Sequence, residues 1–230
     1  MAMKIKKGLQ VQVEITDVAF GGRGLVRLNG MAVFVDQAIP GDRVILRIFR
    51  KKKNYAEARV VERIQSSPFR INPPCEYSGY CGGCKWQFLK YEQQLIYKRQ
   101  HVLDSLEHIG RLNETVVHDT IPSKLMFGYR NKMEFSCSDR RWLLPQELDR
   151  TDVDMGFALG LHVPGTFHKV IDTRECLLQP DLGNQLMDEV RTFMRSSDKP
   201  VYGLRSHIGF WRFLVLRHSV AHDQWMVNIV

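Results

Sequence analysis

Five short strand signals follow one another through the first 65 residues, with no helical signal between them. The first alternates apolar and polar side chains with the period of two that is typical of a half-buried strand. The dipeptide Asn29-Gly30 between the second and third is a strong signal for a tight hairpin. The five segments are residues 10–16, 24–28, 31–35, 43–50 and 55–64. Five antiparallel strands are too few for a sandwich, so they predict a small closed barrel of the oligonucleotide-binding kind.

The positive charge of the chain is concentrated in the same region. The 230 residues carry a formal net charge of +8, and residues 1–70 hold 14 Lys and Arg against 6 Asp and Glu, which accounts for all of it. A compact segment with such an excess attracts polyanions, of which nucleic acid is the commonest in the cytoplasm. A basic face that only promotes solubility is the alternative.

Two features of this region suit contact with a nucleic acid. Cations along the strand and turn at 43–53 can track phosphates. The glycine-rich loop at 20–24 places an aromatic ring beside an arginine, on a backbone free to adopt positive φ, which suits stacking of an unpaired base. The candidate contacts are Phe20, Arg23, Arg43, Arg47, Arg50, Lys51, Lys52 and Lys53.

Short motifs within residues 5–64 narrow the choice of polyanion. They are Asp17-x-Ala19-x-Gly21-Gly22-x-Gly24, Val33-Phe34-Val35, and Ala38-x-Pro40-Gly41-Asp42 ahead of the basic hairpin. Together they resemble a TRAM domain, an RNA-binding barrel attached to RNA-modifying enzymes. The resemblance implies RNA rather than DNA as the partner.

The five cysteines form a second informative pattern. Three lie close together as Cys75-x5-Cys81-Gly82-Gly83-Cys84, and Cys137 and Cys176 lie far downstream. Their odd number and the lack of a secretory signal argue against a disulfide framework. The two glycines allow one turn of backbone to present both flanking sulfurs to the same metal centre.

A cubane iron-sulfur cluster fits this pattern better than zinc does. Zinc sites normally repeat the CxxC pair or add histidines at short spacing, and neither follows Cys84. Four cysteine thiolates are the usual ligands of a cluster. Spacing leaves Cys137 and Cys176 both open as the fourth ligand, but Cys137 lies in a strand pattern, where cysteine is usually inert. We favour Cys176, which lies in a loop, and keep zinc or no metal as alternatives.

A wider set of motifs resembles one enzyme family. The motifs are Pro74-Cys75-x5-Cys81-Gly82-Gly83-Cys84-x-Trp86-Gln87, Gly128 to Phe135, Gly160-Leu161-His162-x-Pro164-Gly165, and Asp172-x-x-x-Cys176. They resemble the iron-sulfur subset of the RNA uracil-5-methyltransferases. In that family a TRAM domain comes first, a central domain holds a [4Fe-4S] cluster, and a Rossmann-like domain that binds S-adenosylmethionine comes last. The resemblance implies the ligands Cys75, Cys81, Cys84 and Cys176; Arg130 and Lys132 complete the RNA-binding candidates.

No catalytic residue is assigned within these 230 residues. In the family a cysteine attacks C6 of uracil and a carboxylate later acts as base, and both belong to the third domain. The sequence shows no glycine-rich strand-to-helix turn that would cradle a nucleotide cofactor. It also ends inside a strand pattern at 224–230. We therefore expect the front portion of a longer enzyme, inactive alone, with S-adenosylmethionine bound beyond Val230.

The whole chain is expected to be an α+β, mainly β protein. A five-stranded TRAM barrel at 1–66 precedes a mixed α/β central iron-sulfur domain at 67–230, with core-facing amphipathic helices at 91–109 and 181–196. Apolar runs fall far short of the roughly 20 residues of a membrane span. We expect a cytoplasmic monomer that binds RNA, with ribosomal RNA favoured over transfer RNA and transfer RNA kept as the alternative. The competing classes are a stand-alone RNA-binding module with a structural zinc, and an electron-transfer protein.

Overall fold

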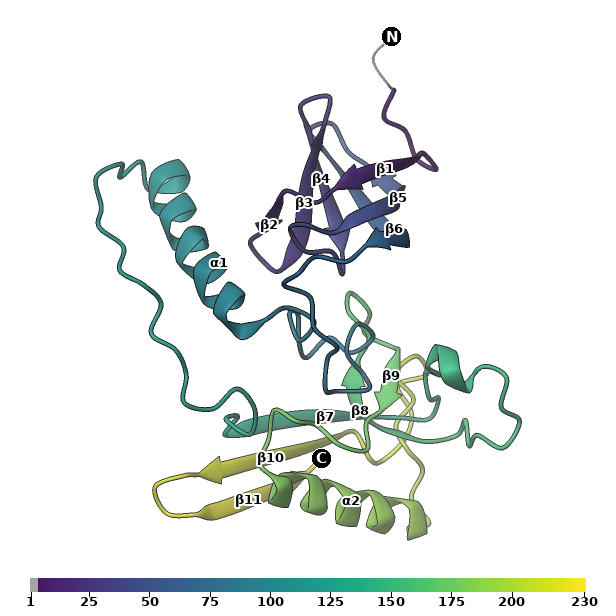
Figure 1. Cartoon of the computed structure of the whole chain (residues 1–230). Coiled ribbons are helices and arrows are strands. Elements are labelled where there is room, and N and C mark those ends of the chain that lie inside the picture. The colour runs from purple at the N-terminus through teal and green to yellow at the C-terminus, as the bar shows by residue number, and fades with distance from the viewer. Residues whose placement is uncertain (1–3) are drawn as a thin grey trace. The chain divides into compact units, whose positions relative to one another are not determined.

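The computed structural model describes residues 4–230, and the chain separates into two compact units. The first comprises Met1–Pro74 and Lys85–Pro122, and the second comprises Cys75–Cys84 and Ser123–Val230. Each unit is built on one sheet (Figure 1). The short segment that carries three of the cysteines therefore belongs to the second unit, although residues of the first unit flank it on both sides.

The first unit contains a six-stranded half-barrel. Its sheet order is β1-β5-β6-β4-β3-β2, and every neighbouring pair is antiparallel except β4 with β6. The strands are β1 Gln10–Glu14, β2 Asp17–Ala19, β3 Arg23–Leu28, β4 Met31–Asp36, β5 Arg43–Lys51 and β6 Tyr55–Gln65. Since β1 and β2 lie at opposite ends of the sheet but are joined by two residues, the sheet must curve back on itself.

The expected five strands are all present, and the sixth, β2, lies directly after the segment expected to form the first. Ile15 donates its N–H to Asp42, next to β5, whereas the N–H of Thr16 is bonded to Leu25 of β3. The chain therefore leaves one neighbour and joins another at this point. Inward-facing aliphatic side chains from β3 to β6, among them Val33, Val35 and Leu46, fill the interior. The result is a curved sheet of six strands in place of the expected five, with its two edge strands joined through Ile15 and Thr16.

Helix α1, Tyr91–Asp104, continues as a π-helical turn over Ser105–Ile109, so the expected helix is confirmed. Its expected apolar core face is not, because α1 has no buried residue. It is held within its unit by the partly buried Tyr97, which packs against Ile39, Phe88 and Leu89, and by polar contacts. Nε2 of His101 lies 2.9 Å from the carbonyl oxygen of Val18, and Arg99 donates to the carbonyl of Val117.

The second unit contains a five-stranded antiparallel sheet in the order β11-β10-β7-β8-β9. Its strands are β7 Lys132–Ser138, β8 Ala158–His162, β9 Val170–Asp172, β10 Phe213–Ser219 and β11 Gln224–Ile229. Helix α2, Asp181–Ser196, lies along β10 and β11 (Figure 1). Its buried residues are Gly183, Met187, Val190, Arg191 and Met194. The spacing of apolar residues predicts a face of Leu182, Leu186, Val190 and Phe193. The buried face is turned from it by about one residue, which leaves Leu182 and Phe193 half exposed.

A buried ion pair ties α2 to the sheet. The Arg191 guanidinium contacts the carboxylate of Asp172 and donates to the carbonyls of Leu159 and Thr173. Asp172 also accepts the N–H of Leu159. Because both charges are buried and hydrogen-bonded, this pair fixes the end of β9, four residues before Cys176.

Among residues 4–230, none of the helices combines the length and the apolar character needed to cross a lipid bilayer.

Candidate metal and RNA-binding sites

Four of the five cysteines affect one another electrostatically within the second unit. Burial raises the pKa of Cys75 and Cys176 and raises that of Cys81 to about 11. Each of these three pKa values is raised further by Cys84, and Cys81 also responds to Cys75 and Cys176. Contacts also bring 75–84 next to the loop after β9, since the N–H of Arg174 donates to the Tyr77 hydroxyl at 3.0 Å and Cys84 packs against the core cluster that contains Cys176.

Backbone donors point at three of these sulfurs. The N–H of Gly83 donates to Sγ of Cys81 at 3.3 Å. Tyr77 and Leu178 donate in the same way to Cys75 and Cys176, and these bonds oppose the effect of burial on the thiol pKa. Each donor lies two residues after its cysteine. Hydrogen bonds to cysteine sulfurs favour the thiolate form and are among the features that tune iron-sulfur clusters.

The glycines between Cys81 and Cys84 are required by close packing. The N–H of Gly82 donates to the carbonyl oxygen of His162 at 2.9 Å, and a Cβ on Gly82 would lie 3.0 Å from the same oxygen. A Cβ on Gly83 would lie 3.2 Å from Leu161 and 3.4 Å from the Cys81 sulfur. This loop therefore packs against the end of β8, and larger side chains would push the sulfurs apart.

Cys137 lies outside this group. Its side chain is fully buried on β7, and its sulfur lies 3.7 Å from the sulfur of Met194 on α2. Burial raises the pKa of Cys137 to about 12, and the one other cause is the charge of Arg191 rather than another cysteine. Cys137 is thus a packing residue of the core.

The four cysteine sulfurs do not converge on a single point. Across the described chain, no three His, Cys, Asp or Glu side chains come together closely enough to hold one metal ion. A cubane cluster places its iron and sulfide core between its ligands, so its thiolates stand farther apart than those on one ion. Four free cysteines on two adjoining loops, three of them with N–H donors, form a donor set of the type a cluster uses.

In the first unit, the cations of β5 lie on its outer face. Val44, Leu46 and Ile48 point inward, so Arg43 and Arg47 alternate with them and are exposed. A register irregularity between Ile48 and Arg50 leaves both Arg50 and Lys51 exposed as well. Lys52 and Lys53 are exposed in the turn that leads to β6.

The structure divides the candidate cations into paired and unpaired groups. Glu57 on β6 contacts Arg23 at 3.2 Å and Arg50 at 3.4 Å, and Arg23 also contacts Asp36 at 2.7 Å. Within the described residues, the remaining cations of the set have no acidic partner. These are Arg43, Arg47, Lys51, Lys52 and Lys53. They remain available for phosphates, whereas Arg23 and Arg50 are partly neutralised.

Sequence spacing missed two residues of this face. Arg59 of β6 is exposed and lies opposite Arg47 in the β5–β6 ladder. Phe49 is partly exposed on the same stretch, between Arg47 and Lys51. The period-2 alternation of β5 could have predicted that Phe49 lies on the outer face. Arg59 could not be predicted in this way, because its place opposite Arg47 depends on the register between two strands.

Phe20 is held in an exposed position by an aromatic group that the sequence did not reveal. Its ring is 85% exposed and meets the ring of His101 edge to face at 5.8 Å. The Trp86 ring lies 5.8 Å from that of His101, and its indole N–H donates to the carbonyl of Gly22 at 3.1 Å. Gly22 has φ +87°, and a Cβ there would lie 2.6 Å from the Trp86 nitrogen. The loop is therefore fixed, and the Phe20 ring faces solvent.

Arg130 and Lys132, the last two RNA-binding candidates, lie in the second unit. The Arg130 N–H donates to the carbonyl of Leu178, and the charge of Arg130 acts on the Cys176 thiol. Lys132 is exposed at the start of β7, where its ammonium lies 3.2 Å from Glu134. Arg130 is thus placed beside the cysteine site.

Comparison with known proteins bears on the first unit directly. Residues 4–61 match the family model described as the TRAM domain. The chain carries a TRAM domain. A TRAM domain implies RNA binding, which agrees with the exposed cations and aromatic ring of this half-barrel.

The relatives of this TRAM-containing chain are RNA methyltransferases. An uncharacterized RNA methyltransferase of Chlorobaculum tepidum is 40% identical over 99% of the chain and 48% of that protein. One from Porphyromonas gingivalis is 40% identical over 95% of the chain and 48% of its own length. The chain is therefore homologous to RNA methyltransferases and spans about half the length of the curated relatives it matches.

A solved structure shares the fold. It is the Pyrococcus abyssi tRNA (uracil-54, C5)-methyltransferase in complex with S-adenosyl-L-homocysteine, with a TM-score of 0.64 and 24% identity. The match covers 95% of this chain and 45% of that one. At this level of identity the likeness supports the fold alone.

Proposed function

We propose that this chain is the RNA-recognition and [4Fe-4S] portion of an S-adenosylmethionine-dependent RNA uracil-5-methyltransferase. The observation that carries the proposal is the grouping of four cysteines in a TRAM-containing chain homologous to RNA methyltransferases. Cys75, Cys81, Cys84 and Cys176 would hold the cluster. When bound, the cluster would tie their two loops together and contribute folding free energy, because an unfolded chain has no preformed site.

In this proposal the two parts of the chain have separate tasks. The TRAM half-barrel, with a boundary near residue 66, binds a single strand through phosphates at the β5–β6 hairpin and a base at Phe20. The central region at 67–230 holds the cluster, with Arg130 and Lys132 as further RNA contacts. S-adenosylmethionine, the attacking cysteine and the base belong to residues beyond Val230.

The reaction and the substrate are tested on the parent protein, extended to the length of its relatives. It is incubated with methyl-labelled S-adenosylmethionine and either ribosomal or transfer RNA lacking the modification, and nucleosides are separated by chromatography. We expect label in 5-methyluridine from ribosomal RNA. Label in transfer RNA alone would contradict the ribosomal assignment, and label in another nucleoside would contradict the uracil reaction.

The alternative is an RNA-binding module with a structural zinc, for which the cysteine sulfurs would have to move closer together than the structure places them. Metal analysis after anaerobic purification separates the two. The cluster predicts about four iron and four sulfide per chain with broad visible absorbance, whereas zinc gives one colourless ion. Stoichiometric zinc after expression with ample iron would favour the alternative.

A further inference from the structure

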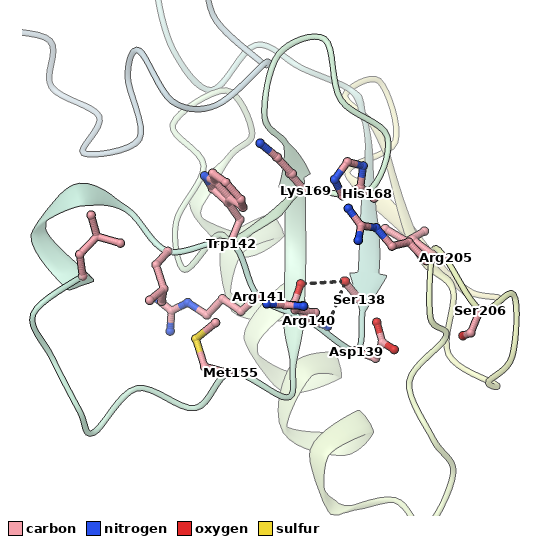
Figure 2. A pocket seen from close by; sticks show the side chains of 13 residues that line it. Ser138, Asp139, Arg140, Arg141, Trp142, Met155, His168, Lys169, Arg205 and Ser206 are labelled. Carbon is pink, nitrogen blue, oxygen red and sulfur yellow. Dashed lines mark hydrogen bonds between the residues drawn. The ribbon is translucent and has the colours of Figure 1, made fainter.

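A basic cavity of about 540 Å³ opens in the second unit, and none of the five cysteines lines it. Most of its lining comes from three segments, and Leu148 and Met155 complete it (Figure 2): residues 138–143 at the end of β7, His168 and Lys169 before β9, and residues 204–206 before β10. Its volume falls within the range of about 300–1,000 Å³ that is usual for small-molecule sites. The cavity is therefore large enough for one nucleotide.

The cavity is positively charged although the sequence outside residues 1–70 has no net charge. Among the described residues, Arg140, Lys169 and Arg205 form no ion pair, while Arg141 contacts Glu147 and Asp172. Asp139 is the acidic residue of the lining. Folding thus collects cations from distant segments, and three of them remain free to meet an anion.

An aromatic side chain stands beside these cations. The Trp142 ring is 41% exposed, and the Lys169 ammonium lies over it, 3.9 Å from its centroid. The backbone N–H of Trp142 donates to the carbonyl of Val170 at 2.8 Å, so β9 fixes its position. A partly exposed indole next to free cations suits a ligand that is both planar and anionic.

His168 adds a vacant hydrogen-bonding position. Its Nδ1 is buried and has no partner among the described residues. Burial and the charges of Arg205 and Lys169 lower the pKa of His168, so the ring is neutral at pH 7. A neutral imidazole can donate to or accept from a polar group such as a ribose hydroxyl.

We propose that this cavity binds one nucleotide of an RNA strand, with its phosphate at Arg140, Lys169 and Arg205 and its base against Trp142. The inference rests on the proposed function and adds a second RNA contact outside the TRAM domain. A free nucleoside 5′-phosphate presents the same chemistry, and an acidic peptide would meet the charge but not need the indole.

The test uses the whole 230-residue chain and a single-stranded oligoribonucleotide that contains 4-thiouridine. After irradiation at long wavelength, crosslinked peptides are identified by mass spectrometry. We expect crosslinks in the TRAM domain and in the peptide that contains Trp142. Crosslinks in the TRAM domain alone would overturn this inference and leave the proposed function intact, whereas a wild-type chain that binds no RNA would contradict the proposed function itself.

Variants show whether the cavity contributes affinity. Removing the two exposed charges in Arg140→Gln/Arg205→Gln should weaken RNA binding about 10-fold at low salt and flatten its salt dependence. Trp142→Ala should weaken binding by about 10-fold with the salt dependence unchanged. Lys124→Gln is the matched control, since this exposed lysine of the second unit does not line the cavity. Unchanged affinity in both test variants would overturn the inference.

Competition identifies the source of the nucleotide. Uridine 5′-monophosphate and an unlabelled oligonucleotide are each titrated into the crosslinking reaction, and their concentrations are compared per nucleotide. An RNA subsite predicts that the oligonucleotide removes the Trp142 crosslink at far lower concentration. Equal competition by both would overturn the assignment to an RNA strand in favour of a free nucleotide. Loss of binding to an aspartate-rich peptide in the arginine variant, with RNA affinity unchanged, would assign the cavity to a protein partner.

Discussion

Cys137 and Cys176 have different surroundings in the structure, and their spacing from Cys84 in the sequence does not reveal this difference. Both are buried, but Cys137 packs against Met194 within the core, whereas Cys176 accepts a backbone N–H and responds to other thiols. The strand pattern around Cys137 was the reason for favouring Cys176 as the fourth ligand. The identity of its neighbours required the fold.

The ligand assignment predicts a clear division among serine substitutions. Cys75→Ser, Cys81→Ser, Cys84→Ser and Cys176→Ser should each lose most of the bound iron, because a cluster needs its four thiolates. Cys137→Ser should retain it. Iron and sulfide per chain are measured after anaerobic purification, and Cys137→Ser also serves as the control for loss of a buried thiol. Iron lost from Cys137→Ser but kept in Cys176→Ser would reverse the assignment.

Asp42 links the stability of the first unit to pH. Burial alone would raise its pKa, but hydrogen bonds from Arg70 and from the N–H groups of Ser67 and Ile39 outweigh burial and lower it. The folded state therefore binds this proton less readily than the unfolded chain does. The stabilisation is complete above the unfolded pKa of about 3.9 and is lost as pH falls through the lower folded value.

Replacing Asp42 with asparagine should make that dependence visible. Asp42→Asn leaves the Arg70 guanidinium without a charged partner, so the free energy of unfolding should fall by about 3 kcal/mol at pH 7. The further loss of stability below pH 4 should be smaller than in the wild type. Urea unfolding at pH 7, 5 and 3 measures both effects. Glu62→Gln, at an exposed position of β6, should change neither, and a pH profile of Asp42→Asn parallel to wild type would refute the linkage.

At the scale of elements, the β5–β6 hairpin predicts an electrostatic contribution to RNA binding. Lys51, Lys52 and Lys53 are exposed and have no acidic partner among the described residues. Each phosphate contact on a single strand contributes roughly −0.7 to the slope of log affinity against log salt. Replacing all three lysines with glutamine should flatten the slope by about 2 and weaken binding to unrelated RNAs alike. Titrations at several salt concentrations measure it, and an unaltered slope would show that the hairpin is only a solvated surface.

The loop between β2 and β3 predicts the opposite signature. Because Trp86 and His101 hold this loop, the exposed Phe20 ring is ready to stack on a base without first being ordered. Phe20→Ala should cost about 1–3 kcal/mol of RNA affinity with the salt slope unchanged. Ile121→Ala removes another exposed apolar side chain of the same unit and should have no effect. Equal losses in the two variants would indicate nonspecific damage.

The helices show where sequence periodicity succeeds and where it fails. The spacing of apolar residues located both helices to within a few residues. It placed the buried face of α2 about one residue away, since the small Gly183 and the charged Arg191 are buried and do not register as apolar. For α1 it predicted a core face, whereas this helix has no fully buried residue and is held by the partly buried Tyr97 and by polar contacts such as that of His101.

At the scale of the whole molecule, the strand-rich first unit was readable from sequence because its contacts are mostly between neighbours in the chain. Hairpin turns and alternation specify such a sheet locally. The cavity at Trp142 was not readable, because its cations come from three segments up to 65 residues apart. The contact between Trp86 and Gly22 was not readable either, because these residues are far apart in the sequence. Residues 71–230 have no net charge as a whole, so their composition did not reveal the excess of positive charge around this cavity.

The length of the match to RNA methyltransferases predicts the behaviour of the isolated chain. It covers 48% of the Chlorobaculum tepidum relative, and no catalytic residue or cofactor cradle was assigned within it. The purified 230 residues should transfer no methyl group to any RNA in the presence of labelled S-adenosylmethionine, although they bind RNA. Detection of labelled 5-methyluridine would show that a catalytic site lies within the chain after all.

The passage of the chain between its units also sets an order in time. Residues 75–84 leave the first unit for the second, and the chain then returns to the first unit until Pro122. Ribosomes add roughly 5–20 residues per second, so the 92 residues from Cys84 to Cys176 take about 5–20 seconds to synthesise. During that interval three thiols have emerged without their proposed fourth partner. A nascent chain therefore cannot complete the proposed site until Cys176 has been made, so a cluster at this site would be inserted well after the first three cysteines are synthesised.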